Sequence, residues 1–337
     1  MHPSSYRSIK VPRGYSYGYF YQAPAADSNL PYVLFLHGFP STSHDWAAQV
    51  AHFTKLGYGV IVPDLLGYGR TDTPKDYDQY KEREIAGDVL AILDEEGVDK
   101  SFIVGHDWGC GPVSRLVDLH PHRFIAVAFL AASYAPVQQG PSNIDDTMKF
   151  FNHTFGTDAF GYWPFFASED GYKVLNENMD SFYDILFPAN PEIWKTHVAP
   201  RDKLREWVTN NQRLPESDRL PAYWDAEARR AHQDSIMGPG GFRGPTNWYK
   251  ASVSGLNNDP DRDPNFKLHP DLPVFFGAAL RDYVCVKAMG EGIMRRFVNP
   301  DRLTIHDFDT SHWVMAEAPQ EVNNALESFF KGISGGR

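Results

Sequence analysis

A turn-forming pentapeptide, Gly105-His106-Asp107-Trp108-Gly109, limits the folds open to this chain more than any other segment. It follows an apolar run over residues 101–104 that predicts a buried strand, and it precedes a helical pattern over residues 112–119. Its two glycines lack a Cβ, so the strand and helix backbones can approach each other closely at the turn. Strand, tight turn and helix in this order predict a nucleophile elbow, which presents its central side chain above a sheet.

The central residue of this turn is Asp107, at the position where serine is usual. A carboxylate with an ordinary pKa is already ionised at neutral pH, so it needs no base before it attacks. It can attack an sp3 carbon and form a covalent ester, which leaves a base free to activate water for a second step. The alternative interpretation is an aspartate that simply suits a glycine-flanked turn.

Strand and helix patterns alternate through the first 130 residues and return near the C-terminus. Such alternation with short connections predicts a mostly parallel sheet. We expect an edge hairpin over residues 9–21, further strands over 32–36, 59–62, 125–130, 273–277 and 303–308, and helices over 45–56, 84–96 and about 316–330.

The pattern changes after Ser133, where the chain becomes rich in aromatic residues and proline and shows no convincing run of buried strands until residue 273. We interpret this region as a helical insertion that covers the active edge of the sheet. The substrate pocket is then expected between sheet and insertion. The expected domains are a core formed by residues 1–135 and 271–337, and a helical cap formed by residues 136–270.

Composition excludes several classes of partner. The chain has 337 residues and a formal net charge of -11, which argues against nucleic acid or an anionic membrane surface. No apolar stretch reaches membrane-spanning length, and residues 1–21 hold no apolar core of a secretion signal. The two cysteines, Cys110 and Cys285, give neither a disulfide framework nor a metal-binding spacing, which fits a reducing, cytoplasmic compartment. The sequence leaves room for a homodimer.

Two further residues complete a candidate triad. Asp282 follows the strand that begins at Pro273, and His312 follows the last strand. With Asp107 they give the order nucleophile, acid, histidine, each at the strand edge where doubly wound sheets bind ligands. We expect His312 to deprotonate water and Asp282 to orient its ring. Taken singly, His312 is more readily interpreted as a loop histidine and Asp282 as a helix cap, but three such residues in order rarely arise by chance.

The loop His37-Gly38-Phe39-Pro40 follows the strand over residues 32–36. We expect the backbone N–H groups of Phe39 and Trp108 to form an oxyanion hole for a tetrahedral intermediate. The alternative is an ordinary Gly-Pro turn.

On these motifs the sequence resembles the α/β-hydrolase superfamily, and within it the epoxide hydrolases, over essentially its whole length. The loop at His37 matches the family's His-Gly-x-Pro loop, in which the x–Pro bond is typically cis, and the pentapeptide matches the aspartate elbow. Thr246-Asn247-Trp248-Tyr249 resembles the cap motif whose tyrosine holds the epoxide oxygen, and Phe160-Gly161-Tyr162-Trp163 resembles the site of the partner tyrosine. One departure is Ser311, which stands where most members have glycine.

The resemblance implies an α/β-hydrolase fold with a mostly parallel central sheet and an inserted helical cap. It also implies a small-molecule epoxide substrate and no metal, nucleotide or flavin cofactor. Asp107, Asp282, His312, Tyr162 and Tyr249 are the expected catalytic residues. The residues expected to line the substrate pocket are His37, Pro40, His106, Trp248 and Trp313.

The two tyrosines favour an epoxide over a halide. Opening an epoxide leaves a basic alkoxide, and a phenol that is protonated at neutral pH can donate the required proton. A departing halide needs only hydrogen-bond donors. The alternative for Tyr162 and Tyr249 is packing in an aromatic-rich region, and Tyr172 or Tyr183 are candidates to replace Tyr162.

The predicted reaction converts an epoxide and water to a vicinal diol through a covalent ester on Asp107. Two alternatives stay open. One is a haloalkane or haloacid dehalogenase with the same nucleophile, since Trp108 suits either class whereas Phe39 and His106 favour the epoxide branch. The other is a non-catalytic ligand receptor on the same fold.

Overall fold

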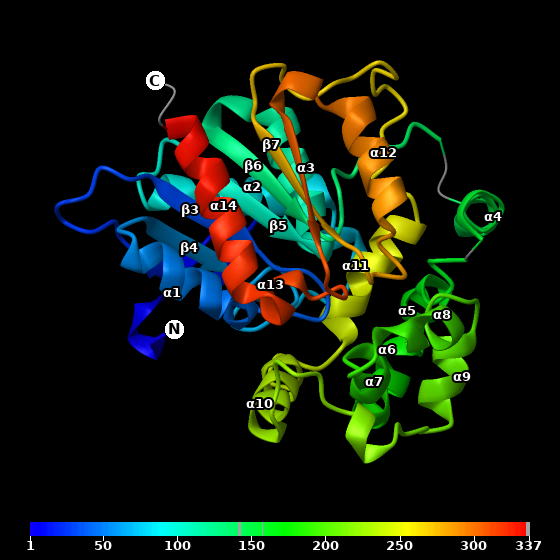
Figure 1. Ribbon diagram of the computed structural model, residues 1–337. Coiled ribbons are helices and arrows are strands. Elements are labelled where there is room, and N and C mark those ends of the chain that lie inside the picture. Colours follow the sequence, from blue (N-terminus) through cyan, green and yellow to red (C-terminus); the bar gives the residue numbers. More distant parts are fainter. Residues whose placement is uncertain (141–142, 157, 335–337) are drawn as a thin grey trace.

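An eight-stranded sheet organises the computed structural model, which describes residues 1–140, 143–156 and 158–334 (Figure 1). The strand order is β1-β2-β4-β3-β5-β6-β7-β8; β2 pairs antiparallel with both β1 and β4, and all pairs from β4 to β8 are parallel. The mostly parallel sheet is therefore confirmed. The strands are β1 (Tyr6–Lys10), β2 (Ser16–Gln22), β3 (Tyr32–Leu36), β4 (Gly59–Pro63), β5 (Ser101–His106), β6 (Phe124–Leu130), β7 (Val274–Ala279) and β8 (Leu303–Phe308).

Helices cover both faces of the sheet, α1 and α14 on one face and α2 and α3 on the other (Figure 1). The central strands are buried on both sides, which explains why β3 and β6 are continuous apolar runs rather than alternating patterns. The core helices are α1 (Ala47–Lys55), α2 (Glu82–Glu95), α3 (Cys110–Leu119), α12 (Lys287–Phe297), α13 (Val314–Glu317) and α14 (Pro319–Ser334).

The C-terminal helix differs from its prediction. Residues 316–330 were expected to form one helix, but the short helix α13 ends at Glu317 and α14 begins at Pro319. Proline has no N–H to continue the helix and its ring clashes with the preceding turn, whereas it suits the first position of a new helix.

The segment between β6 and β7 is helical, and among its described residues no strand is present. Most of its helices lie together beside the end of the sheet near α11 and α13 (Figure 1). They are α4 (Ile144–Phe155), α5 (Trp163–Ala167), α6 (Gly171–Glu177), α7 (Met179–Leu186), α8 (Trp194–His197), α9 (Lys203–Thr209), α10 (Ala226–Met237) and α11 (Arg243–Val253).

Aromatic contacts join this helical insertion to the sheet domain. The ring of Phe39, in the loop after β3, lies 5.0 Å from Phe166, 5.0 Å from Tyr249 and 6.0 Å from Phe242. Each such pair contributes roughly 0.5–1.5 kcal/mol beyond the apolar area it buries. The insertion is thus held over the carboxyl ends of β3 and β5. Among the described residues, no helix combines the length and the apolar character required to cross a membrane.

Candidate active site

The elbow places Asp107 in a strained backbone conformation between β5 and α3. Its φ of 50° lies in the left-handed region, which non-glycine residues rarely adopt. A Cβ at Gly109 would collide with the carbonyl oxygen of Leu36 on β3, so glycine is required for the turn to pass this close to the neighbouring strand. The strain is consistent with a side chain held out from the sheet for function.

The carboxylate of Asp107 has two close partners. The backbone N–H of Phe39 donates to its Oδ1 at 2.7 Å, and Nε2 of His312 lies 3.5 Å from its Oδ2. A Cβ at Gly38 would collide with the same carboxylate, so this loop approaches Asp107 only because residue 38 is glycine. The Phe39–Pro40 peptide bond is cis.

His312 is held from two directions. Its Nδ1 lies 2.6 Å from Oδ2 of Asp282, whose Oδ1 accepts the backbone N–H groups of Val284 and Cys285 at 2.9 Å each. The ring N–H at Nε2 of His106 donates to the carbonyl of His312 at 2.8 Å. Burial, then the nearby charge of His312, lowers the pKa of His106 to about 4, so its ring is neutral at pH 7. The structure therefore brings the three predicted triad residues together.

The electrostatics of Asp107 and His312 oppose the effect of burial. Burial raises the pKa of Asp107, but His312 and the Phe39 amide lower it, and the net pKa lies below the usual carboxyl value. Burial lowers the pKa of His312, but Asp282 and Asp107 raise it well above its usual 6.5. The free protein therefore favours an ionised Asp107 beside a protonated His312.

Two phenols, one buried and one half-buried, lie near the nucleophile. Tyr249 is on α11 and Tyr162 directly precedes α5, and their ring centroids are 6.0 Å apart. The ring of Tyr249 also lies 4.8 Å from that of Trp108. Burial raises the pKa of both phenols well above 10.0, and the charge of Asp107 contributes to each shift. Both side chains are therefore protonated at neutral pH.

The two tyrosines that the sequence offered in place of Tyr162 have other surroundings. The hydroxyl of Tyr183 is hydrogen-bonded to Nδ1 of His232 at 2.7 Å. The ring of Tyr172 lies 5.7 Å from Nζ of Lys250.

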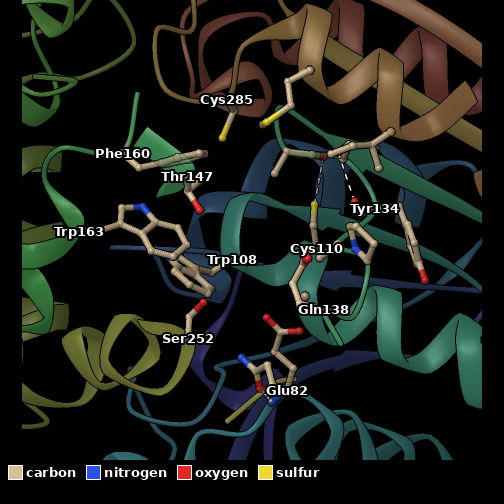
Figure 2. Close-up of a pocket in the computed structure, with 18 of the residues that line it drawn as sticks. Glu82, Trp108, Cys110, Tyr134, Gln138, Thr147, Phe160, Trp163, Ser252 and Cys285 are labelled. Atoms are coloured by element: carbon tan, nitrogen blue, oxygen red, sulfur yellow. Dashed lines mark hydrogen bonds between the residues drawn. The ribbon is translucent and has the colours of Figure 1, made fainter. Parts of the chain in front are cut away.

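A cavity of about 600 Å³ opens onto the nucleophile, and its wall includes Asp107, Trp108 and Tyr162. Figure 2 shows Trp108 and Trp163 on one side of it, with Cys285 and Glu82 at other parts of the wall. The sequence reasoning singled out neither Glu82 nor Cys285 as a site residue. Glu82 belongs to a helix end and Cys285 to a loop, and nothing in their local sequence pattern indicates a cavity.

The predicted lining of the substrate pocket stays a prediction. None of the five residues expected there is among the described residues that form the wall of this cavity: His37, Pro40, His106, Trp248 and Trp313.

Three of these residues, His37, His106 and Trp248, make hydrogen bonds to the backbone behind the wall. The ring of His37 accepts the N–H of Leu65 at Nε2, 2.9 Å away, and the indole N–H of Trp248 donates to the carbonyl of Leu66 at 3.0 Å. These two bonds fix the loop after β4, and the bond from His106 fixes the loop that carries His312. These hydrogen-bonding atoms are turned toward protein, and the bonds support the loops around the site.

Three potential metal ligands also meet at this site. Ligand atoms of Asp282, Cys285 and His312 lie within 4.8 Å of one another. The carboxylate and Nδ1 in this trio are hydrogen-bonded to each other. We therefore assign the carboxylate of Asp282 and Nδ1 of His312 to the acid–histidine pair of the triad.

Comparison with known proteins agrees with this arrangement. A family model of the alpha/beta hydrolase fold matches residues 31–163. The structure of an epoxide hydrolase from Vigna radiata is similar with a TM-score of 0.75 at 22% identity, covering 98% of this chain and 100% of that one. Sheet, elbow and structural similarity together define an α/β hydrolase.

Sequence relatives narrow the class. An epoxide hydrolase from Caballeronia sordidicola is 37% identical, covering 90% of this chain and 88% of the relative. Epoxide hydrolase 3 of Siraitia grosvenorii is 30% identical, covering 89% of this chain and 91% of the relative. The chain belongs to the epoxide hydrolase family.

Proposed function

We propose that this protein hydrolyses an epoxide to a vicinal diol through a covalent ester on Asp107. The observation that carries the proposal is the ionised carboxylate at the elbow, with His312 at 3.5 Å on one side and two protonated phenols nearby. An ionised carboxylate supplies the nucleophile and the phenols supply the acid, which are the two groups that opening an epoxide requires.

In the first step Asp107 attacks the less hindered ring carbon and the C–O bond of the epoxide breaks. Tyr162 and Tyr249 donate hydrogen bonds to the oxygen, and one of them transfers its proton to the developing alkoxide. Burial favours this role, because it destabilises the phenolate and keeps both phenols protonated until the alkoxide forms.

The second step needs a neutral histidine, so His312 must release its proton after the first step, and the phenolate left by that step takes up one proton in turn. Once Asp107 becomes an ester it loses its charge, so one of the two carboxylates that raise the pKa of His312 is gone. His312 then accepts a proton from water as the water oxygen attacks the ester carbonyl, and Asp282 stabilises the imidazolium. The tetrahedral intermediate collapses by breaking its bond to the alkyl oxygen. The departing alkoxide takes the proton of the new carboxyl group, which releases the diol and restores ionised Asp107. The amides of Phe39 and Trp108 hold the oxyanion, in keeping with the bond that Phe39 already makes to Asp107.

Removing one phenol should slow the first step. We expect Tyr249→Phe and Tyr162→Phe each to lower the rate of ester formation by about 10²-fold, since each loses a general acid while the ring still fills its space. Single-turnover kinetics with a fluorescent or chromogenic epoxide measures this rate. Tyr172→Phe is the matched control, and a loss of equal size in that variant would contradict the assignment.

The pH profile should separate the two steps. Ester formation requires ionised Asp107, whose lowered pKa keeps it active as the pH falls below neutral. Hydrolysis requires neutral His312, so it slows as the pH falls through the pKa of His312 in the ester. The alkylated protein should therefore accumulate under acidic conditions, measured by mass spectrometry of samples quenched during turnover. Accumulation on the alkaline side instead would reverse the assigned roles.

The dehalogenase alternative rests on one observation. Trp108 and Trp163 face the same cavity with ring centroids 5.2 Å apart, and paired indole N–H groups are suitable donors to a halide. The decisive assay presents small epoxides and haloalkanes separately and measures diol and halide release. Diol formation that is lost in Asp107→Asn supports the proposed function, and halide release without diol replaces it.

Three further parts of the proposal concern organisation. We assign residues 136–270 to a cap domain, supported by the helices α4 to α11 between β6 and β7. We assign a cytoplasmic location, supported by the free thiols of Cys110 and Cys285. A homodimer is the third part, and light scattering of the purified protein tests it.

A further inference from the structure

One carboxylate in the cavity has no role in the proposed chemistry. Glu82 is the first residue of α2 and is only 8% exposed. Its backbone N–H donates to Oδ1 of Asn257 at 3.0 Å, but within the described residues its carboxylate makes no hydrogen bond and no ion pair. The carboxylate oxygens are not among the fully enclosed polar atoms without a partner, so they are open to the cavity and free to bind a hydrogen-bond donor there.

The carboxylate of Glu82 faces the same cavity as Asp107. Both residues belong to the cavity wall, and Figure 2 shows the Glu82 carboxylate directed toward Trp108 and Cys110. A Cβ added at Gly111 would lie 2.6 Å from its Oε1, so the carboxylate rests against the first turn of α3. Gly111 follows Asp107 by four residues, about one helical turn. A substrate bound at Asp107 therefore has a hydrogen-bond acceptor within the same space.

The surroundings of Glu82 favour a neutral donor over a cation. Burial raises the pKa of Glu82, and Arg115, on the same cavity wall, opposes that shift. Arg115 is 5% exposed and 3.1 Å from Asp118, so its positive charge is fixed in place. Glu82 would attract a substrate ammonium group, but the nearby charge of Arg115 offsets part of that attraction, whereas a hydroxyl group can donate to the carboxylate with little effect from Arg115.

We propose that Glu82 is a specificity residue that binds the hydroxyl group of an epoxide bearing an alcohol remote from the ring. This inference rests on the proposed function and names the substrate class for the same site. A carboxylate at the first position of α2 also interacts favourably with the helix dipole. If Glu82 served only to stabilise the helix, its side chain would not need to face the cavity. Its replacement would then change kcat/KM equally for all substrates.

The test uses matched pairs of terminal 1,2-epoxides that end in either a hydroxymethyl or an ethyl group, over a series of chain lengths. The readout is the ratio of kcat/KM for the hydroxylated member to that for its alkyl partner. This ratio cancels any change in chemistry or folded fraction common to both substrates. For at least one chain length we expect Glu82→Leu to lower the ratio about 10- to 100-fold, the loss of one hydrogen bond to a charged group.

Two more variants keep the test independent of folding. Glu82→Gln preserves the shape and should lower the ratio less, because its amide oxygen still accepts. Gly111→Ala should also lower the ratio although residue 82 is unchanged, because the new Cβ displaces the Glu82 carboxylate. The matched control is Asp146→Asn, a carboxylate on the same wall whose side chain is 66% exposed and paired with Lys149, and its ratio should equal that of the unchanged protein.

The outcomes distinguish this inference from the proposed function. Turnover of both substrates with the same ratio in all variants overturns the Glu82 assignment and leaves epoxide hydrolysis standing. Preference for an ammonium-ended epoxide over the hydroxylated one also overturns it. If the unchanged protein forms no diol from either member of any pair, the proposed function fails and the inference with it.

Discussion

Replacing His312 with glutamine is expected to stop turnover after one alkylation. Asp107 and the two phenols remain, so the ester should form, but water is no longer activated and hydrolysis should slow by about 10²- to 10⁴-fold, the range for loss of a general base. The protein should gain the mass of one epoxide molecule. Intact-protein mass spectrometry after incubation with substrate measures the gain, and peptide mapping places it on the peptide that contains Asp107.

The control for this variant is His306→Gln on β8, where the histidine is exposed and bonded to Glu321. It should turn over normally and gain no mass. Normal turnover in His312→Gln would show that the triad is assigned incorrectly. Loss of turnover without a stable ester would show that His312 is needed for ester formation, and would contradict its assignment to ester hydrolysis alone.

Replacing Asp107 with asparagine is expected to abolish diol formation, with kcat reduced by at least about 10⁴-fold, the scale on which removal of a catalytic nucleophile acts. Asparagine preserves the shape of the side chain and tolerates the left-handed backbone of this position better than alanine. The variant should therefore remain folded, which circular dichroism and thermal unfolding check directly.

The double variant Asp107→Asn/His312→Gln links the two experiments. If Asp107 is the nucleophile, the double variant should gain no mass under conditions in which His312→Gln is fully alkylated. A mass gain that persists would place the ester on another side chain, and Cys285 in the cavity wall would then be the first candidate.

The local sequence was sufficient for the framework of the site. Apolar runs of strand length, the glycines around Asp107 and the positions of Asp282 and His312 after strands are encoded over a few neighbouring residues. The structure places these three side chains within hydrogen-bonding or near-contact distance, because parallel strands deliver their carboxyl ends to one edge of the sheet. The break at Pro319 was also readable locally, although the predicted helix ran across it.

Tertiary packing decided which side chains face the cavity. Trp248 and His37 carry suitable chemistry, yet their polar atoms hold backbone behind the wall, whereas Glu82 and Cys285 lie on the wall with no local signal for it. The placement of Tyr162, rather than Tyr183, on the cavity wall with Asp107 likewise depends on how the inserted helices pack on the sheet domain. Sequence periodicity records that a side chain is buried, but contacts between segments far apart in the chain determine whether it is buried against protein or against a cavity.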